Sequence, residues 1–123
     1  MSVTGTFEID LTPQEDAGYP AGRMLIKKTY LGDMNGSGFG QMISKRLENG
    51  TAVYHAIEEF SGSIQGKNGG FTLIHKGHMN KDLQSLEVTI LEGSGSGELQ
   101  NISGSMLIIQ DENGHRYELT FEL

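Results

Sequence analysis

The chain has 123 residues, a net charge of -7 and no cysteine. Its length fits a single domain over residues 1–123, and the missing cysteines exclude disulfides, thiol nucleophiles and cysteine-ligated metals. The acidic charge argues against a nucleic-acid partner, and no apolar run approaches the roughly 20 residues of a membrane helix. We therefore expect a cytoplasmic protein with neither nucleic acid nor membrane as partner.

The N-terminal quarter alternates apolar and polar residues at period two. Residues 3–11 place their odd-numbered, apolar side chains on one face, which we expect to point inward, and this strand should end at Pro13 because proline has no N–H to donate. Residues 12–22 hold both prolines and predict the longest irregular connection. Residues 23–31 predict a second strand whose two faces are nearly equal in apolar content, so its orientation stays open.

Residues 52–66 form the longest alternating segment. Such a length is typical of strands in barrels or strongly coiled sheets. The face that carries Tyr54 and Phe60 also carries Glu58, a charged residue among apolar ones. Glu58 is therefore the residue of this strand that packing alone does not explain.

Asn-Gly pairs predict tight hairpin turns at Asn35-Gly36, Asn49-Gly50, Asn68-Gly69 and Asn113-Gly114. A two-residue loop at the second pair places Glu58 opposite Gln41. A two-residue loop at the third places Gly62 opposite His75 and puts His75 on the inward face with Phe71. In this register His75 lies on the order of 13 Å along the strand from Glu58, so we expect no direct contact between them.

The C-terminal half continues the pattern. Strands are predicted over residues 83–91, 106–109 and 115–123, and the glycine- and serine-rich stretch 93–97 reverses the chain between the first two. About eight antiparallel strands, tight turns and no convincing helix predict an all-β fold, a single antiparallel up-and-down β-barrel, with an open sandwich as the alternative. The interior of such a barrel holds either packed side chains or one small ligand.

The chain resembles the domain of unknown function 3224 family, small bacterial proteins grouped with allene oxide cyclase in a superfamily of eight-stranded barrels. The segments that carry the resemblance are Gly32-Asp33-Met34, Tyr54-x-Ala56-x-Glu58, His75-x-Gly77, residues 93–99 and His115-x-Tyr117-x-Leu119. The resemblance implies an allene oxide cyclase-like barrel and, by kinship with the cyclase, a lipophilic cavity. It implies no activity and no catalytic residue.

Glu58 is the sharpest candidate for chemistry. Burial inside a barrel would raise the pKa of its carboxyl and suit it to general acid or base catalysis, with Tyr54 two residues away on the same face. The alternative is a structural carboxylate that bonds Gln41, Tyr54, a buried water or Lys45. The sequence leaves both interpretations open.

Other kinds of site are weakly supported. The four histidines contain no His-x-His pair that would place two imidazoles on one strand face, so we predict no metal site. The glycine run at residues 93–97 lacks the Lys-Ser/Thr ending of a phosphate-binding loop, so we predict a turn there and no cofactor. No serine lies in the strand-to-helix elbow of a hydrolase.

Three hypotheses about function follow. The leading one is a binding module that holds an apolar or amphipathic small molecule in the barrel. The second is a cyclase- or isomerase-like enzyme in which Glu58 and Tyr54 transfer a proton. The third is a structural protein that forms homo-oligomers through outer-face residues such as Val53 and Ile57. The predicted ligand contacts are Gln41, Phe60, Phe71, His75, Tyr117 and Phe121.

Overall fold

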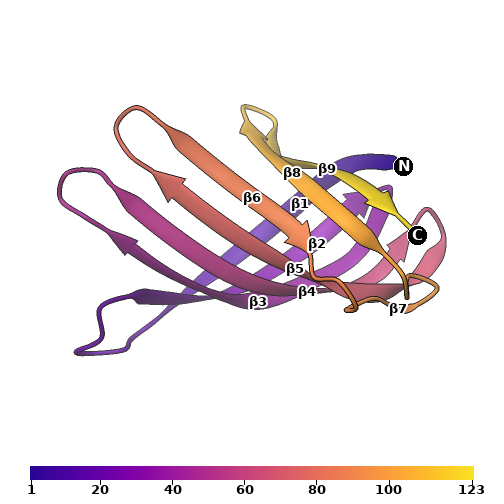
Figure 1. The fold of residues 1–123 in the computed structure, drawn as a ribbon, viewed down its shortest axis with the longest axis horizontal. Helices are drawn as coiled ribbons and strands as arrows, with labels where there is room; N and C mark the ends of the chain where they lie inside the picture. Colours follow the sequence, from indigo (N-terminus) through magenta and orange to yellow (C-terminus); the bar gives the residue numbers. More distant parts are fainter.

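The computed structural model describes residues 1–123 and consists of strands and their connections. Eight strands form a closed antiparallel barrel in which chain neighbours pair and β9 returns to β1 (Figure 1). A ninth strand of two residues, β7, pairs with the beginning of β5. The strands are β1 Ser2–Gln14, β2 Gly22–Gly32, β3 Met34–Arg46, β4 Ala52–Ile64, β5 Lys67–Met79, β6 Gln84–Ile90, β7 Ser96–Gly97, β8 Ser103–Asp111 and β9 Gly114–Glu122.

This architecture confirms the predicted all-β, up-and-down barrel. The odd-numbered face of β1 points inward as expected, since Val3 and Phe7 are buried. The strand does not end at Pro13 but continues to Gln14, because Pro13 lies at the end of the ladder opposite Met24, where one missing donor is tolerated. The structure offers no helix with the length and apolar character that crossing a membrane requires.

The predicted register between β3 and β4 is wrong by one residue. The chain reverses through a loop over residues 47–51, and the ladder begins with Arg46 opposite Ala52. The backbone of Leu47 donates to Thr51 at 2.7 Å and closes this longer loop. A shift of one residue exchanges the two faces of a strand's partner. Gly40 therefore lies opposite Glu58, where Gln41 was expected.

The turn between β4 and β5 is also displaced. It uses Gln65 and Gly66, whose φ angles of 49° and 84° suit the left-handed positions of a tight hairpin turn. The predicted turn at Asn68-Gly69 lies inside β5, and Asn35-Gly36 lies inside β3. The true turn comes three residues earlier, so every pairing between β4 and β5 differs from the predicted one.

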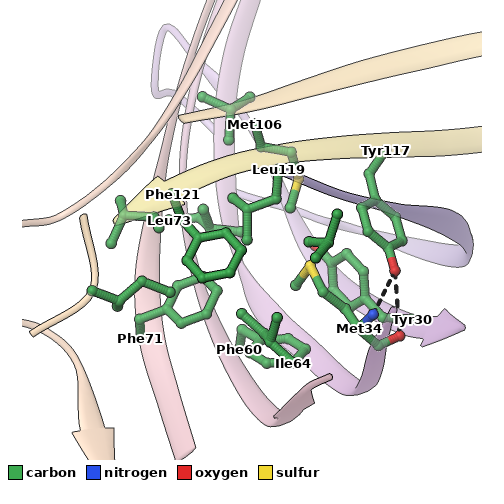
Figure 2. Packing of buried hydrophobic residues seen from close by; sticks show 14 of the residues in the cluster. Tyr30, Met34, Phe60, Ile64, Phe71, Leu73, Met106, Tyr117, Leu119 and Phe121 are labelled. Carbon is green, nitrogen blue, oxygen red and sulfur yellow. Dashed lines mark hydrogen bonds between the residues drawn. The ribbon is translucent and has the colours of Figure 1, made fainter. Parts of the chain in front are cut away.

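The two ends of the barrel differ. The β1–β2, β3–β4, β5–β6 and β8–β9 loops lie at one end, which we call the open end; the termini and the other connections lie at the opposite, plugged end (Figure 1). A cluster of 16 buried hydrophobic residues fills the interior toward the plugged end (Figure 2). Leu99 and Ile102, both almost fully buried, enter this cluster from the β6–β8 connection and close the barrel.

Tyr117 ties strands together at the plugged end. Its hydroxyl accepts a hydrogen bond from the backbone amide of Met34 at 2.8 Å, shown in Figure 2, and donates one to the carbonyl of Leu31 at 3.1 Å. The Tyr117 ring covers Gly5, where an added Cβ would lie only 2.3 Å from the hydroxyl oxygen. Glycine is therefore required at this position of β1 because a side chain would displace the ring.

Toward the open end, solvent reaches the inward-facing side chains. Residues that point into the barrel but stay only partly buried are Ile9, Met24, Met42, Tyr54, Met79, Leu86, Ile108 and His115. Paired strands cover most of them from outside, but β6 and β8 pair only at residues 88–89 and 105–106, so solvent enters at the open end and beside this short pairing. We call the part around the buried cluster the filled half, and the part whose inward side chains stay partly exposed the open half.

Candidate functional site

Four polar side chains meet inside the barrel where the filled half ends. Glu58 on β4 is fully buried, and its Oε1 accepts hydrogen bonds from Lys28 Nζ at 2.9 Å and His75 Nε2 at 2.8 Å. Its Oε2 accepts a hydrogen bond from the Tyr30 hydroxyl at 2.5 Å. Lys28 and Tyr30 belong to β2, and His75 belongs to β5. We call these four residues the Glu58 network.

Glycine on β3 makes room for the Glu58 network. Lys28 pairs with Gly38 on β3, and Glu58 pairs with Gly40 on the same strand. A Cβ added at Gly38 would lie 2.1 Å from Glu58 Oε2 and 3.0 Å from the Tyr30 ring. β3 lies between β2 and β4, and a side chain on β3 would normally keep their side chains apart. Because Gly38 has none, the groups from β2 and β4 meet across β3.

His75 reaches Glu58 along a diagonal of the β4–β5 ladder. The residue directly opposite Glu58 is Leu73, and His75 lies opposite Ala56, two residues nearer the open end. Diagonal neighbours on one face are about 7–8 Å apart at Cα, a distance that two long side chains span easily. The ladder therefore presents the imidazole to the carboxylate.

The Glu58 network keeps its carboxylate ionised. Burial raises the pKa of Glu58, but the hydrogen bond from His75, the charge of Lys28 and the hydrogen bond from Tyr30 outweigh burial and lower the pKa from 4.5 to about 2. Burial and the neighbouring Glu58 charge raise the pKa of Tyr30 far above its ordinary value, so its hydroxyl stays protonated and donates. Lys28 Nζ also lies 4.7 Å from the centre of the Phe7 ring, a favourable cation–π contact.

These contacts make Glu58 a fixed counter-ion that orients His75. Three donors occupy its two oxygens, and no buried side-chain nitrogen or oxygen of the protein lacks a partner. An ionised carboxylate can only accept, so His75 Nε2 carries the hydrogen, and Nδ1 of a neutral imidazole is an acceptor. The His75 side chain is 7% exposed, and Nδ1 has no partner within the protein. Because every buried side-chain nitrogen has a partner, Nδ1 belongs to the exposed part of the ring. One imidazole nitrogen is thus held in place and the other stays accessible.

The family model described as "Protein of unknown function (DUF3224)" matches residues 3–122. The chain belongs to the DUF3224 family. It is 34% identical to a protein of unknown function from this family in Shewanella oneidensis MR-1, whose crystal structure superposes with a TM-score of 0.91 over 100% of this chain and 96% of that one. No curated protein matches. The resemblance to the family is confirmed, whereas kinship with allene oxide cyclase stays a prediction.

The Glu58 neighbours predicted from the sequence are wrong in this DUF3224 chain. His75 was expected to lie too far away and instead bonds Glu58 directly, because the β4–β5 turn comes earlier than predicted. Gln41 was expected opposite Glu58 and instead lies exposed on the outer face opposite Ile57. Lys45 is exposed on the same outer face, and the ion pair with Glu58 is made by Lys28.

The other predicted site residues divide between the two halves. Tyr54 points into the open half, where its ring covers Gly77 and partial burial raises the pKa of its hydroxyl. It makes no hydrogen bond to Glu58. The four predicted aromatic contacts pack in the buried cluster of the filled half: Phe60, Phe71, Tyr117 and Phe121. Their inward orientation is confirmed, and their contact with a ligand stays a prediction.

Lys28 and Tyr30 are the site residues that the sequence did not identify. Their strand has two nearly equal faces, so neither face could be assigned to the interior. The available signal was that Lys28 alternates with Ile26 and Tyr30, which makes it an isolated cation on a face that is otherwise apolar. An unpaired carboxylate on one inward face predicts a cation on another.

Other places in the molecule do not form comparable sites. No group of three His, Asp or Glu side chains could hold a metal ion. A hollow of about 550 Å³ lies along β4, β5 and the segment 94–97, but none of the Glu58 network lines it. Two of its three serine hydroxyls are engaged, since Ser94 donates to the carbonyl of Leu91 and Ser96 to that of Gly70. Its one charged side chain, Glu59, is exposed, so the hollow holds no buried charged group comparable to Glu58.

Proposed function

We propose that this DUF3224 protein binds an amphipathic small molecule in the open half of the barrel, above the Glu58 network. The observation that carries the proposal is that inward-facing side chains such as Met24, Met42 and Tyr54 stay partly exposed. Small-molecule sites typically combine apolar walls with a few placed polar groups. Methionine side chains adapt readily to an apolar ligand.

The accessible nitrogen of His75 indicates which polar group the ligand carries. In the neutral imidazole of His75, Nδ1 is an accessible acceptor, because Glu58 fixes the hydrogen on Nε2. A ligand with an apolar body and a hydroxyl or N–H group at one end would complement the apolar walls and this acceptor. In this proposal Phe60, Phe71, Tyr117 and Phe121 support the floor from below and do not touch the ligand.

A cyclase- or isomerase-like activity through Glu58 and Tyr54 has weaker support. A carboxylate whose pKa is lowered to about 2 is a poor proton acceptor at neutral pH. Its oxygens are already occupied by donors from Lys28, Tyr30 and His75, and none bonds Tyr54. The contacts of Glu58 favour a positioning role in binding.

Fluorescence titration with 8-anilinonaphthalene-1-sulfonate tests whether the open half binds apolar molecules. We expect saturable binding that weakens at least about tenfold in Met42→Glu, which places among the apolar walls a charge that also repels the sulfonate. Leu107→Glu, an exposed position on the outer face of β8, is the matched control and should bind as the wild type does. Absence of saturable binding, or equal loss in both variants, would contradict the proposal.

A pair of competing probes tests the acceptor at His75. 1-Decanol and its methyl ether have similar apolar bodies, but only the alcohol can donate a hydrogen bond. We expect the alcohol to displace the fluorescent probe at about fivefold lower concentration, the effect of one hydrogen bond of about 1 kcal/mol. Equal displacement by both compounds would remove His75 from the proposed site. Native mass spectrometry of gently purified protein, with organic extraction, would then reveal any co-purifying ligand.

A further inference from the structure

Exposed apolar side chains gather on the outer face of β2, β3 and β4. Phe39 is 57% exposed, Ile57 is 58% exposed, and Leu25, Ile43 and Val53 are also exposed. These strands are adjacent in the sheet (Figure 1), so the side chains form one surface, which we call the β2–β4 face. β2, β3 and β4 are each paired on both sides, so association of this part of the barrel with another copy uses its outer face and not a strand edge. Adjacent exposed apolar groups mark such a face.

The strand register arranges the β2–β4 face in rows. One row across the three strands reads Lys27, Phe39 and Glu59, with the cation on β2 and the anion on β4. The next row reads Leu25, Gln41 and Ile57, with apolar side chains on both outer strands. In each row the group on β2 can therefore pair favourably with the group on β4, a cation with an anion in the first row and two apolar side chains in the second.

We propose that two copies of this chain associate through their β2–β4 faces about a two-fold axis that runs along β3. Such an axis places β2 of one copy against β4 of the other at the same row, and the same contact occurs twice. Lys27 then meets Glu59 of the second copy, and Leu25 meets Ile57 of the second copy. Phe39 lies on the axis and packs against its own symmetry mate.

Charge selects this axis over the alternative. A two-fold axis across the strands, through the row of Gln41, would bring Lys27 against Arg23 of the second copy, which already pairs with Asp16 and offers Lys27 no anion. Lys27 makes no ion pair within its own chain. Glu59 accepts a hydrogen bond from Thr72 through Oε1, which leaves Oε2 free. Both partners of the proposed contact thus remain available.

Sedimentation equilibrium of the full chain tests the proposal. We expect a dimer that Phe39→Glu dissociates, while Leu107→Glu on the outer face of β8 leaves it intact. Lys27→Glu and Glu59→Lys should each weaken association about tenfold, and the double variant should restore it because the charges exchange places. A monomeric wild type would overturn the proposal. A dimer that both single variants weaken but the double variant fails to restore would overturn the axis.

Carbodiimide cross-linking provides an independent measurement. A mixture of unlabelled and ¹⁵N-labelled chains is cross-linked, and the peptides are analysed by mass spectrometry. We expect mixed-isotope peptides that join Lys27 to Glu59, since the contact is between copies. Only same-chain cross-links at these residues, in a preparation that sediments as a dimer, would refute the assignment of Lys27 and Glu59 to the interface.

Discussion

Replacing Glu58 with Gln removes the charge on which the buried Lys28 depends, and we expect a large loss of stability at neutral pH. A fall in pKa from 4.5 to about 2 on folding corresponds to about 3 kcal/mol, because a tenfold change in ionisation is worth about 1.4 kcal/mol. Breaking a buried ion pair typically costs about 3–5 kcal/mol, and the Lys28 side chain is only 4% exposed. The two arguments agree on the magnitude.

The effect of Glu58→Gln depends on pH with a definite sign. The pKa of Glu58 is lower in the folded than in the unfolded protein, so the stabilisation is complete above the unfolded value of 4.5 and is lost as pH falls toward about 2. The variant lacks this contribution at every pH. The difference in unfolding free energy between wild type and variant should therefore shrink as the solution is acidified.

Urea unfolding followed by circular dichroism, at steps from about pH 7 to about pH 3, measures this difference. The surface carboxyls Asp16 and Asp111, whose pKa values are also lowered, titrate in both proteins, so the comparison isolates Glu58. Glu118→Gln, at an exposed position on β9, is the control and should match the wild type throughout. Parallel loss of stability in wild type and Glu58→Gln on acidification would refute the reasoning.

Three further substitutions test the packing, each by urea unfolding. Gly38→Ala puts a Cβ 2.1 Å from the buried carboxylate and should cost about 1–3 kcal/mol, whereas Gly22→Ala, whose Cβ would make only ordinary contacts with Ser44 at 3.8 Å, should cost little. Tyr117→Phe leaves a buried backbone amide of β3 without its partner and should cost about 1–3 kcal/mol, with the fold unchanged by circular dichroism. Leu99→Ala opens the plug and should cost about 2–5 kcal/mol, against about 0.5 kcal/mol for the exposed Leu107→Ala.

The barrel could be predicted because alternation at period two is a property of each strand by itself. The run from His115 to Phe121 shows the inward face of β9 without reference to any other strand. Since chain neighbours pair throughout the sheet apart from the short β7, eight such strands in sequence lead directly to an up-and-down barrel. The architecture therefore follows from local patterns and short connections.

The register could not be predicted with the same success because it depends on one turn per hairpin. Asn68-Gly69 has the composition of a tight turn, yet Gln65 and Gly66 take that conformation. With the turn at residues 65–66, Phe60 lies opposite Phe71 and their rings pack 5.1 Å apart. Packing between strands thus overrode the local preference of the Asn-Gly pair.

The candidate site shows the same division. The inward position of Glu58 was evident from its own strand, but its neighbours were not, because they come from β2 and β5 through the register. The environment changed the chemistry as well: burial alone predicts a raised carboxyl pKa, and three donors reverse it. To predict the direction of a pKa shift in a barrel interior, one must therefore know every neighbour of the titrating group.

Packing does not by itself require a charged layer in this barrel. Apolar residues fill the plugged half, and replacing a buried ion pair with apolar side chains of similar volume is often neutral or stabilising. The charges of Lys28 and Glu58 must be desolvated, and their mutual attraction only offsets that cost. What the charged layer adds is a His75 ring fixed at the foot of the open half with one nitrogen accessible. In the proposed function, this layer is the polar floor of the ligand site.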